Sequence, residues 1–419
     1  MAALFAGGLP RWTGLTSSTD PAGVVSIVPS PLDGASALAR QPTKGSLAHD
    51  TAWLAGLRQR VIDLTAPPLS DRTGLSCRGL AANQMSILYA ADLGGIRLAV
   101  VELPCTVDAR GLSRGRIWLT ADAGSAPGRM EISGALWSNL PDPMGMDIGD
   151  RMVGVDPTRT VLRRVVVLTS TSATVWAQNS VSYGADGQQS IGYDAVPATE
   201  PGVHIYLAEK AHGAVTVTAG GQEWPLAASQ EAAAEITARI PNPSRRIDSA
   251  RLQEFVRGGL TLARATPTDL TPALTIFGPD NSMVAVLTLR TSSGTTIAVA
   301  GHAEAQFAGG IALDGALVIP VGRPMTLAWH LIYEGNPTDR FAVMGPSDAR
   351  RVELLDSSNQ TLGSFEVQDG HAVITSPQAR AATTVRFLDT SDRVLATTAL
   401  RDERDHLARL GAPFGRVGG

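Results

Sequence analysis

The clearest pattern along the chain is the alternation of apolar and polar residues in short segments. Residues 85–92 and 96–103 alternate or carry β-branched side chains, and Leu93, Gly94 and Gly95 separate them. A glycine turn between two such segments favours a β-hairpin, because glycine tolerates positive φ. Short segments of the same kind recur along residues 162–226 and 283–398. The pattern therefore predicts a mostly antiparallel β protein.

Two segments carry the apolar spacing of a helix instead. Residues 46–64 place leucine and valine side chains at that spacing, and Asp50 precedes them as a capping residue. Residues 245–257 carry a second apolar set of the same kind. The pattern predicts one helix in each segment, with an Ala-rich connection between them at residues 231–244.

The order of these elements occurs twice along the chain. A helix, a hairpin and a run of short strands fill residues 47–230, and the same order follows in residues 245–402. Self-similarity over so long a period is typical of duplicated domains. Chance stays open as the alternative, because the segments share element order and not residue identity. We predict an α+β, mostly antiparallel β fold, a tandem of two related halves, each a helix plus antiparallel sheet followed by a small β-sandwich.

These elements divide the chain into seven predicted segments. They are a linker or arm at 1–46, a helix plus antiparallel sheet at 47–158, a β-sandwich at 159–230, a connection at 231–244, a second helix plus antiparallel sheet at 245–338, a second β-sandwich at 339–402 and a C-terminal tail at 403–419. The arm opens with an apolar run followed by Arg11 and Trp12, residue types of a membrane interface. It is either an ordinary terminus or the tail of a membrane anchor whose upstream part is missing.

Composition narrows the classes of function. A chain of 419 residues with 44% hydrophobic content can bury a sizeable core. Its formal net charge of −4 and scattered basic residues argue against a nucleic-acid partner. The sequence contains no P-loop and no nucleophile elbow. We therefore predict no cofactor, and an enzyme is not the leading hypothesis.

The two cysteines are the first candidates for covalent chemistry. Cys77 precedes the first predicted hairpin and Cys105 follows it. This placement is compatible with a disulfide across the base of the hairpin. Two buried thiols are the alternative, and a metal site needs more ligands than this pair offers.

A second group of candidates is acidic. The predicted loop at 139–157 contains Asp142, Asp147, Asp150 and Asp156. Carboxylate oxygens are the ligands that calcium prefers, so this loop is a speculative metal site. The spacing matches no known calcium loop, and a solvated acidic loop is the alternative.

Aromatic residues and histidines complete the candidates. The seven tryptophans mostly fall on predicted strands or the first helix, where core packing is expected. Trp137 and Trp224 lie near predicted strand ends and are the speculative ligand-binding residues. We expect His204 and His212 to be surface or edge residues, and His330 to lie at the edge of the core.

The hairpin segment carries a family resemblance. Residues 87–101, read as Ile-Leu-Tyr-Ala-Ala-Asp-Leu-Gly-Gly-Ile-Arg-Leu-Ala-Val-Val, resemble the hairpin of uncharacterised actinobacterial extracytoplasmic proteins. Residues 163–175 and 183–187 are similar to the same family. Such proteins are typically anchored by one N-terminal membrane helix and are often encoded beside sigma factors. The resemblance implies an outward-facing, membrane-anchored β-rich domain and carries over no catalytic or binding residue.

These observations lead to three functional hypotheses. The first is a non-enzymatic extracytoplasmic binding or sensory module of a bacterial cell envelope, whose partner is an unknown protein or envelope ligand. The second is a cell-wall or glycan hydrolase that uses loop carboxylates such as Asp142 and Asp150. The third is a structural surface or assembly protein. A cytoplasmic location is the alternative to the extracytoplasmic one.

Overall fold

A computed structural model describes most of the chain. The described residues are 35–65, 75–76, 80–107, 112–137, 142–148, 163–208, 212–240, 247–264, 270–278, 282–304, 311–333 and 336–401. Within them are α1 (Thr51–Thr65), α2 (Gln230–Arg239), α3 (Ser249–Ala263) and the short 3-10 helices Leu38–Arg40, Ala82–Gln84, Pro127–Arg129 and Pro377–Arg380. All other regular structure there is β, and the strand pairs of the sheets are antiparallel. The prediction of a mostly antiparallel β protein is confirmed.

The first helix packs against the sheet that contains the predicted hairpin. Asp50 accepts a hydrogen bond from the backbone N–H of Trp53 at 2.9 Å and so caps α1 as predicted. Sheet A contains β1 (Leu75–Ser76), β2 (Ser86–Leu93), β3 (Ile96–Val107), β4 (Leu112–Asp122) and β5 (Glu131–Trp137). The predicted hairpin is β2–β3, which turns at Gly94 and Gly95, both at positive φ.

Sheet A is buried on both faces because its side chains alternate. Ala99 and Val101 pack against α1, whereas Leu98 and Val100 pack against a second sheet. This sheet B has the order β10 (Ala198–Glu200), β11 (Val203–Leu207), β7 (Arg164–Leu168), β6 (Met144–Ile148). The far face of sheet B packs against sheet C, with the order β13 (Gln222–Leu226), β12 (Val215–Ala219), β8 (Val175–Tyr183), β9 (Gln189–Val196).

Helix α1 and sheets A, B and C form a first stack of layers, and a second stack follows in the chain. Helices α2 and α3 pack against sheet D, ordered β14 (Leu270–Phe277), β15 (Ser282–Thr291), β16 (Thr296–Glu304), β17 (Ala312–Ile319). Sheet D packs against sheet E, ordered β18 (Leu327–Tyr333), β19 (Asn336–Met344), β22 (His371–Thr375). Sheet E packs against sheet F, ordered β21 (Thr361–Glu366), β20 (Arg351–Leu355), β23 (Thr384–Leu388), β24 (Val394–Ala399).

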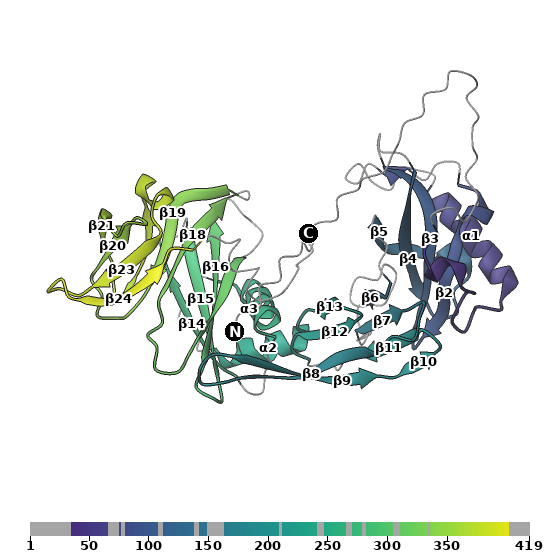
Figure 1. Cartoon of the computed structure of the whole chain (residues 1–419), viewed down its shortest axis with the longest axis horizontal. Coiled ribbons are helices and arrows are strands. Elements are labelled where there is room, and N and C mark those ends of the chain that lie inside the picture. The colour runs from purple at the N-terminus through teal and green to yellow at the C-terminus, as the bar shows by residue number, and fades with distance from the viewer. Residues whose placement is uncertain are drawn as a thin grey trace, which may run out of the picture.

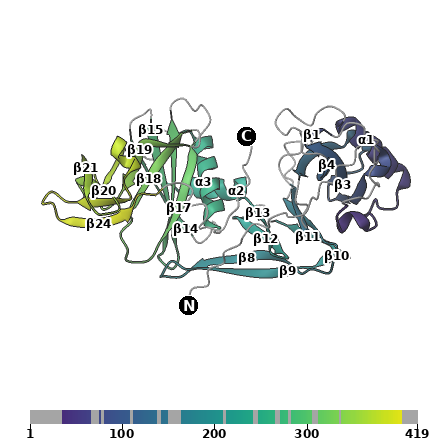
Figure 2. The same ribbon diagram turned by 45° about the horizontal axis from the view of Figure 1, so that its top comes forward.

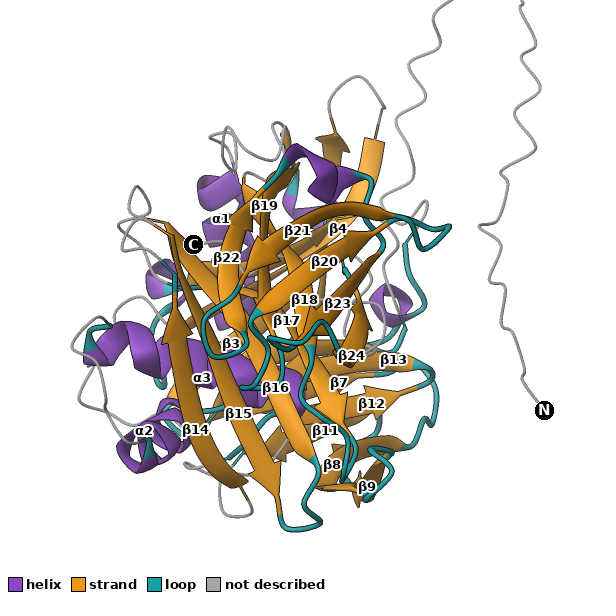
Figure 3. Cartoon of the chain, turned by 90° about the vertical axis from the view of Figure 1, so that its left-hand side faces the viewer, coloured by secondary structure: helices purple, strands orange, loops and turns teal. Residues whose placement is uncertain are grey.

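The two stacks form the ends of an elongated molecule. In Figure 1, α1 and sheet A lie at one end, and sheets E and F lie at the other. The β8–β9 hairpin runs between the two ends, as the turned view in Figure 2 also shows. Figure 3 shows that strands make up most of the molecule and that α2 and α3 lie beside one another.

Several predicted boundaries differ from the structure. The segment 231–244, expected to be a connection, contains most of α2, and the second predicted helix extends to Ala263 as α3. The predicted loop at 139–157 contains strand β6, which pairs with β7 across the boundary at 158 and 159. The boundary at 338 and 339 falls inside β19. Alanine favours helix as strongly as it suits a linker, so composition alone could not separate the two.

Candidate functional site

Glu102 on β3 is a fully buried charged group of the first stack. Its carboxylate accepts hydrogen bonds from the Ser36 backbone N–H at 3.0 Å and from the Ser36 hydroxyl at 2.5 Å. It also pairs with Arg114 and Arg116 of β4, each at 3.1 Å between guanidinium Nε and carboxylate oxygen. The cluster joins the segment before α1 to sheet A.

The electrostatics of this cluster favour the ionised carboxylate. Burial by itself raises the pKa of Glu102, but the hydrogen bonds from Ser36 and the charge of Arg116 outweigh burial and lower the pKa below its ordinary value of 4.5. Because both carboxylate oxygens already accept hydrogen bonds from protein groups, the cluster acts as a structural anchor.

Asp142, one of the predicted acidic residues, lies at the exposed surface next to sheet B. Its carboxylate accepts hydrogen bonds from the Ser170 backbone N–H at 2.9 Å and from the Ser170 hydroxyl. Lys44 lies nearby and donates a hydrogen bond to the Thr169 carbonyl at 2.9 Å. Burial lowers the pKa of Lys44, while the charges of Glu200 and Asp142 oppose that shift. Asp142 therefore holds the loop after β7 in place.

The remaining acidic residues of the predicted metal site do not gather around Asp142 in the described part. Asp147 lies on β6 and forms an ion pair with Arg163. Asp150 and Asp156 lie outside the described residues. In the described ranges no group of three or more His, Cys, Asp or Glu side chains is placed to hold a metal ion. A calcium site in this segment stays a prediction.

The second stack contains a buried histidine–carboxylate pair. His302 of β16 contacts Asp314 of β17 at 2.6 Å between Nδ1 and Oδ1, and the indole N–H of Trp329 on β18 donates to Oδ2 at 2.9 Å. A carboxylate also orients the general base of many hydrolases. Here, however, only 7% and 6% of the His302 and Asp314 side chains are exposed. The three residues join sheet D to sheet E, and a substrate has no room to approach them.

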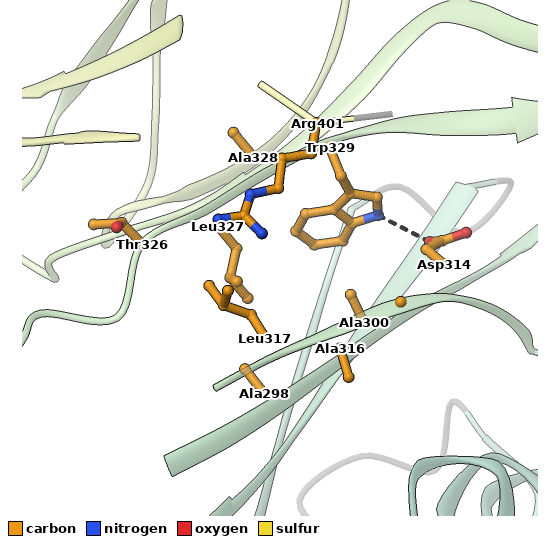
Figure 4. Close-up of a pocket in the computed structure, with 11 residues that line it drawn as sticks. Ala298, Ala300, Asp314, Ala316, Leu317, Thr326, Leu327, Ala328, Trp329 and Arg401 are labelled. Carbon is orange, nitrogen blue, oxygen red and sulfur yellow. Dashed lines mark hydrogen bonds between the residues drawn. The ribbon is translucent and has the colours of Figure 1, made fainter. Parts of the chain in front are cut away.

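A small cavity lies beside this pair, between β16, β17 and β18. Figure 4 shows Asp314 and Trp329 on one side, Arg401 above, and the small side chains Ala298 and Ala300 below. The cavity volume is about 20 Å³. That is enough for one water molecule, whereas small-molecule sites usually measure about 300–1,000 Å³. The cavity is a packing gap between alanine-rich strands.

The two predicted ligand-binding tryptophans have different outcomes. Trp224 on β13 is half-buried and packs so closely on Gly145 of β6 that a Cβ added there would overlap the indole. It therefore fills the space between sheets B and C. Trp137 ends β5 opposite Gly115, and its side chain lies outside the described residues.

Among the tryptophans whose side chains the structure describes, Trp176 is the exposed one that sequence reasoning missed. Its side chain on β8 is 43% exposed, although a position on a strand suggested core packing. The neighbours Val175 and Ala177 are buried, so alternation places Trp176 on the opposite face. The small residues Ala195 and Thr218 stand directly beside it on β9 and β12. Alternation separates the two faces of the strand, but the layer packed against sheet C decides which face is exposed.

The histidine expectations were partly wrong. His204 and His212, expected at the surface or at an edge, are buried at 7% and 9% exposure. His204 is satisfied by the Val196 carbonyl at 2.8 Å, which explains how an imidazole is accommodated there. His330 is 9% exposed, as expected for the edge of the core. His302 was not singled out, although Asp314 in an otherwise apolar strand signals a buried partner.

The described residues define an antiparallel β protein of packed sheets with internally paired polar clusters. No family model matches the chain, and no curated protein matches it either. Among solved structures, it aligns with a tetra-tandem repeat in the extending region of a large adhesion protein, at 11% identity over 73% of this chain and 95% of that chain. The TM-score of 0.14 is too low for a shared fold. Within the described ranges no helix is both long and apolar enough to cross a membrane.

Proposed function

We propose that this chain is a non-enzymatic binding module of a bacterial cell envelope, displayed outside the membrane. The observation that carries this proposal is the exposed indole of Trp176 on the outer face of sheet C. Tryptophan contributes disproportionately to binding surfaces, because it offers a large apolar area with few rotatable bonds. In the Glu102 cluster and in the His302 cluster, by contrast, the polar atoms form hydrogen bonds to other groups of the same cluster.

We further propose that the chain is a tandem of two related halves. The strand orders support this. Sheet A contains β2-β3-β4-β5 and sheet D contains β14-β15-β16-β17; sheet B contains β6-β7-β11 and sheet E contains β18-β19-β22; sheet C contains β9-β8-β12-β13 and sheet F contains β21-β20-β23-β24. In chain order these series match strand for strand, while β1 of sheet A and β10 of sheet B have no counterpart in sheets D and E. The match pairs the β2–β3 hairpin with β14–β15.

The extracytoplasmic location is supported by the family resemblance of residues 87–101. The proteins that the segment resembles are anchored in the membrane and are often encoded beside sigma factors. We therefore propose that the module senses or binds an envelope component or a partner protein.

Co-sedimentation of the purified chain with isolated cell-wall and membrane fractions of the bacterium that encodes it tests this proposal. We expect the wild-type chain to sediment with one of these fractions. Trp176→Ala should weaken that binding about tenfold, the loss typical of a central contact. The matched control is Val394→Ala, since Val394 is 51% exposed and begins β24, which Figure 1 shows well apart from β12 and β13.

The outcomes separate the parts of the proposal. A wild-type chain that binds no envelope fraction contradicts the function itself. Binding that Trp176→Ala leaves unchanged contradicts only the role of Trp176. Far-ultraviolet circular dichroism of each variant checks that the sheets are intact.

A further inference from the structure

The β8–β9 hairpin extends beyond the sheet to which it belongs. β8 pairs with β9 along its whole length, from Val175 to Tyr183. Its other neighbour, β12, pairs only with the stretch from Val175 to Ala177. The rest of the hairpin is a two-stranded ribbon, which is at best marginally stable in water unless it packs on something else. Figures 1 and 2 show this ribbon reaching towards sheet D.

One side of the ribbon docks on the end of α3. Tyr183 is 6% exposed and belongs to the hydrophobic core that α2, α3 and sheet D share. Its hydroxyl donates a hydrogen bond to the Ala263 carbonyl and accepts one from the Gln189 side chain at 2.9 Å. Further back, the Gln178 side chain donates to the Arg264 carbonyl at 3.2 Å. The ribbon therefore covers the last turn of α3.

The turn of the ribbon docks on the loops at the end of sheet D. The hydroxyl of Thr295, in the β15–β16 turn, donates to the Gly184 carbonyl at 2.6 Å. The backbone N–H of Val321, after β17, donates to the Ala185 carbonyl at 2.9 Å. Gly187 lies against the same loop, where an added Cβ would come within 3.2 Å of Pro320. Two separate loops of the second stack thus hold the turn.

We propose that this ribbon is a strap that holds the two stacks of sheets in one fixed arrangement. Between β13 and α2 the chain itself has only residues 227–229, and the ion pair between Glu223 of β13 and Arg264 is a further contact beside that connection. The strap adds contacts to the last turn of α3, which itself contacts that connection through Thr261 and Ala228, and to both loops of sheet D. Release of the strap is the conformational change that this geometry permits. The inference goes beyond the proposed binding function and does not depend on it.

The strap does not respond to pH in the physiological range. Its polar contacts are hydroxyl, amide and backbone donors bonded to neutral acceptors. Burial raises the pKa of Tyr183 to about 12, so the phenol stays protonated and keeps its donor function.

Two conservative variants test the strap in the full chain. Thr295→Val removes the donor to Gly184, and Tyr183→Phe removes the hydroxyl that donates to Ala263. Hydrogen exchange of the Val321 amide reports whether the turn is docked, because that amide donates to the strap. We expect each variant to speed this exchange about fivefold, the effect of one lost neutral hydrogen bond. In the double variant the Val321 amide should exchange faster still. Its radius of gyration in small-angle X-ray scattering should be larger than that of wild type.

The control is Tyr193→Phe, which makes the same change on β9 outside the docked turn and should leave both measurements at wild-type values. Unchanged Val321 exchange and scattering in the double variant would overturn the strap. So would a lower melting temperature with unchanged Val321 exchange, because the bonds would then stabilise one stack without joining the two.

Discussion

Glu102 illustrates how a single charge is accommodated between two sheets. A carboxylate without exposed surface is costly unless hydrogen bonds and opposite charges surround it. Ser36 supplies the hydrogen bonds and two arginines supply the charge. The lowered pKa of Glu102 means that the folded state favours its ionised form. The stabilisation is therefore present above the ordinary pKa of 4.5 and is lost as the pH falls through the lower folded value.

Glu102→Gln tests this account. We expect the variant to unfold with a free energy about 3 kcal/mol lower than wild type at neutral pH, because the arginines lose their counter-charge. Between about pH 5 and about pH 3 the wild-type stability should fall more steeply than that of the variant. Urea unfolding at a series of pH values measures both effects. Glu366→Gln at the exposed edge strand β21 is the control, and parallel pH curves for wild type and Glu102→Gln would contradict the assignment.

The cysteines give a second prediction at the scale of residues. Cys77 and the side chain of Cys105 lie outside the described residues, so the disulfide across the base of the hairpin stays a prediction from the sequence. We expect thiol labelling in intact cells with a membrane-impermeant maleimide only after reduction. Labelling that needs cell lysis but no reductant would contradict both the disulfide and the extracytoplasmic location.

At the scale of elements, the helices begin where side chains complete their first turns. Ser229 accepts a hydrogen bond from the Ala232 backbone N–H at the start of α2, and Asp248 accepts one from Arg251 at the start of α3. Arg264 ends α3 in the left-handed region, at φ of 51°. These caps set the ends of two helices that the ribbon and sheet D pack against.

The cap of α3 is open to a direct test. Asp248→Ala should lower the free energy of unfolding by about 1 kcal/mol, the usual cost of losing a capping side chain. Asp248→Asn keeps an oxygen acceptor and should stay close to wild type. Chemical denaturation of the wild type and of both variants measures these free energies. If both variants lost the same free energy of unfolding, the charge of Asp248 would matter and its capping hydrogen bond would not.

At the scale of the whole molecule, burial on both faces explains how thin sheets make a large core. Sheets A, B, D and E are each covered on two sides, whereas sheets C and F form outer layers. The outer layers carry the exposed apolar side chains Trp176 and Val394. Under the proposed binding function these outer faces are the ones that a partner would contact, and the β8–β9 strap keeps them at a constant spacing.

The sequence by itself determined most of the strands, the positions of α1 and α3 and the β2–β3 turn, but it predicted the segment of β6 as part of a loop. Alternation along a strand and the glycines at Gly94 and Gly95 act over a few residues, so a local pattern suffices to predict them. Local signals also misled where two outcomes share one composition, as in the Ala-rich segment that forms α2.

Only the tertiary structure decided which polar groups meet and which tryptophan faces solvent. Ser36 and Glu102 are 66 residues apart, and Tyr183 and Ala263 are 80 apart. Their contacts depend on which sheet packs against which, and no periodicity along the chain encodes that choice. Trp176 is exposed and Trp329 is buried for the same reason, because each strand has two faces and the neighbouring layers decide which of them water reaches.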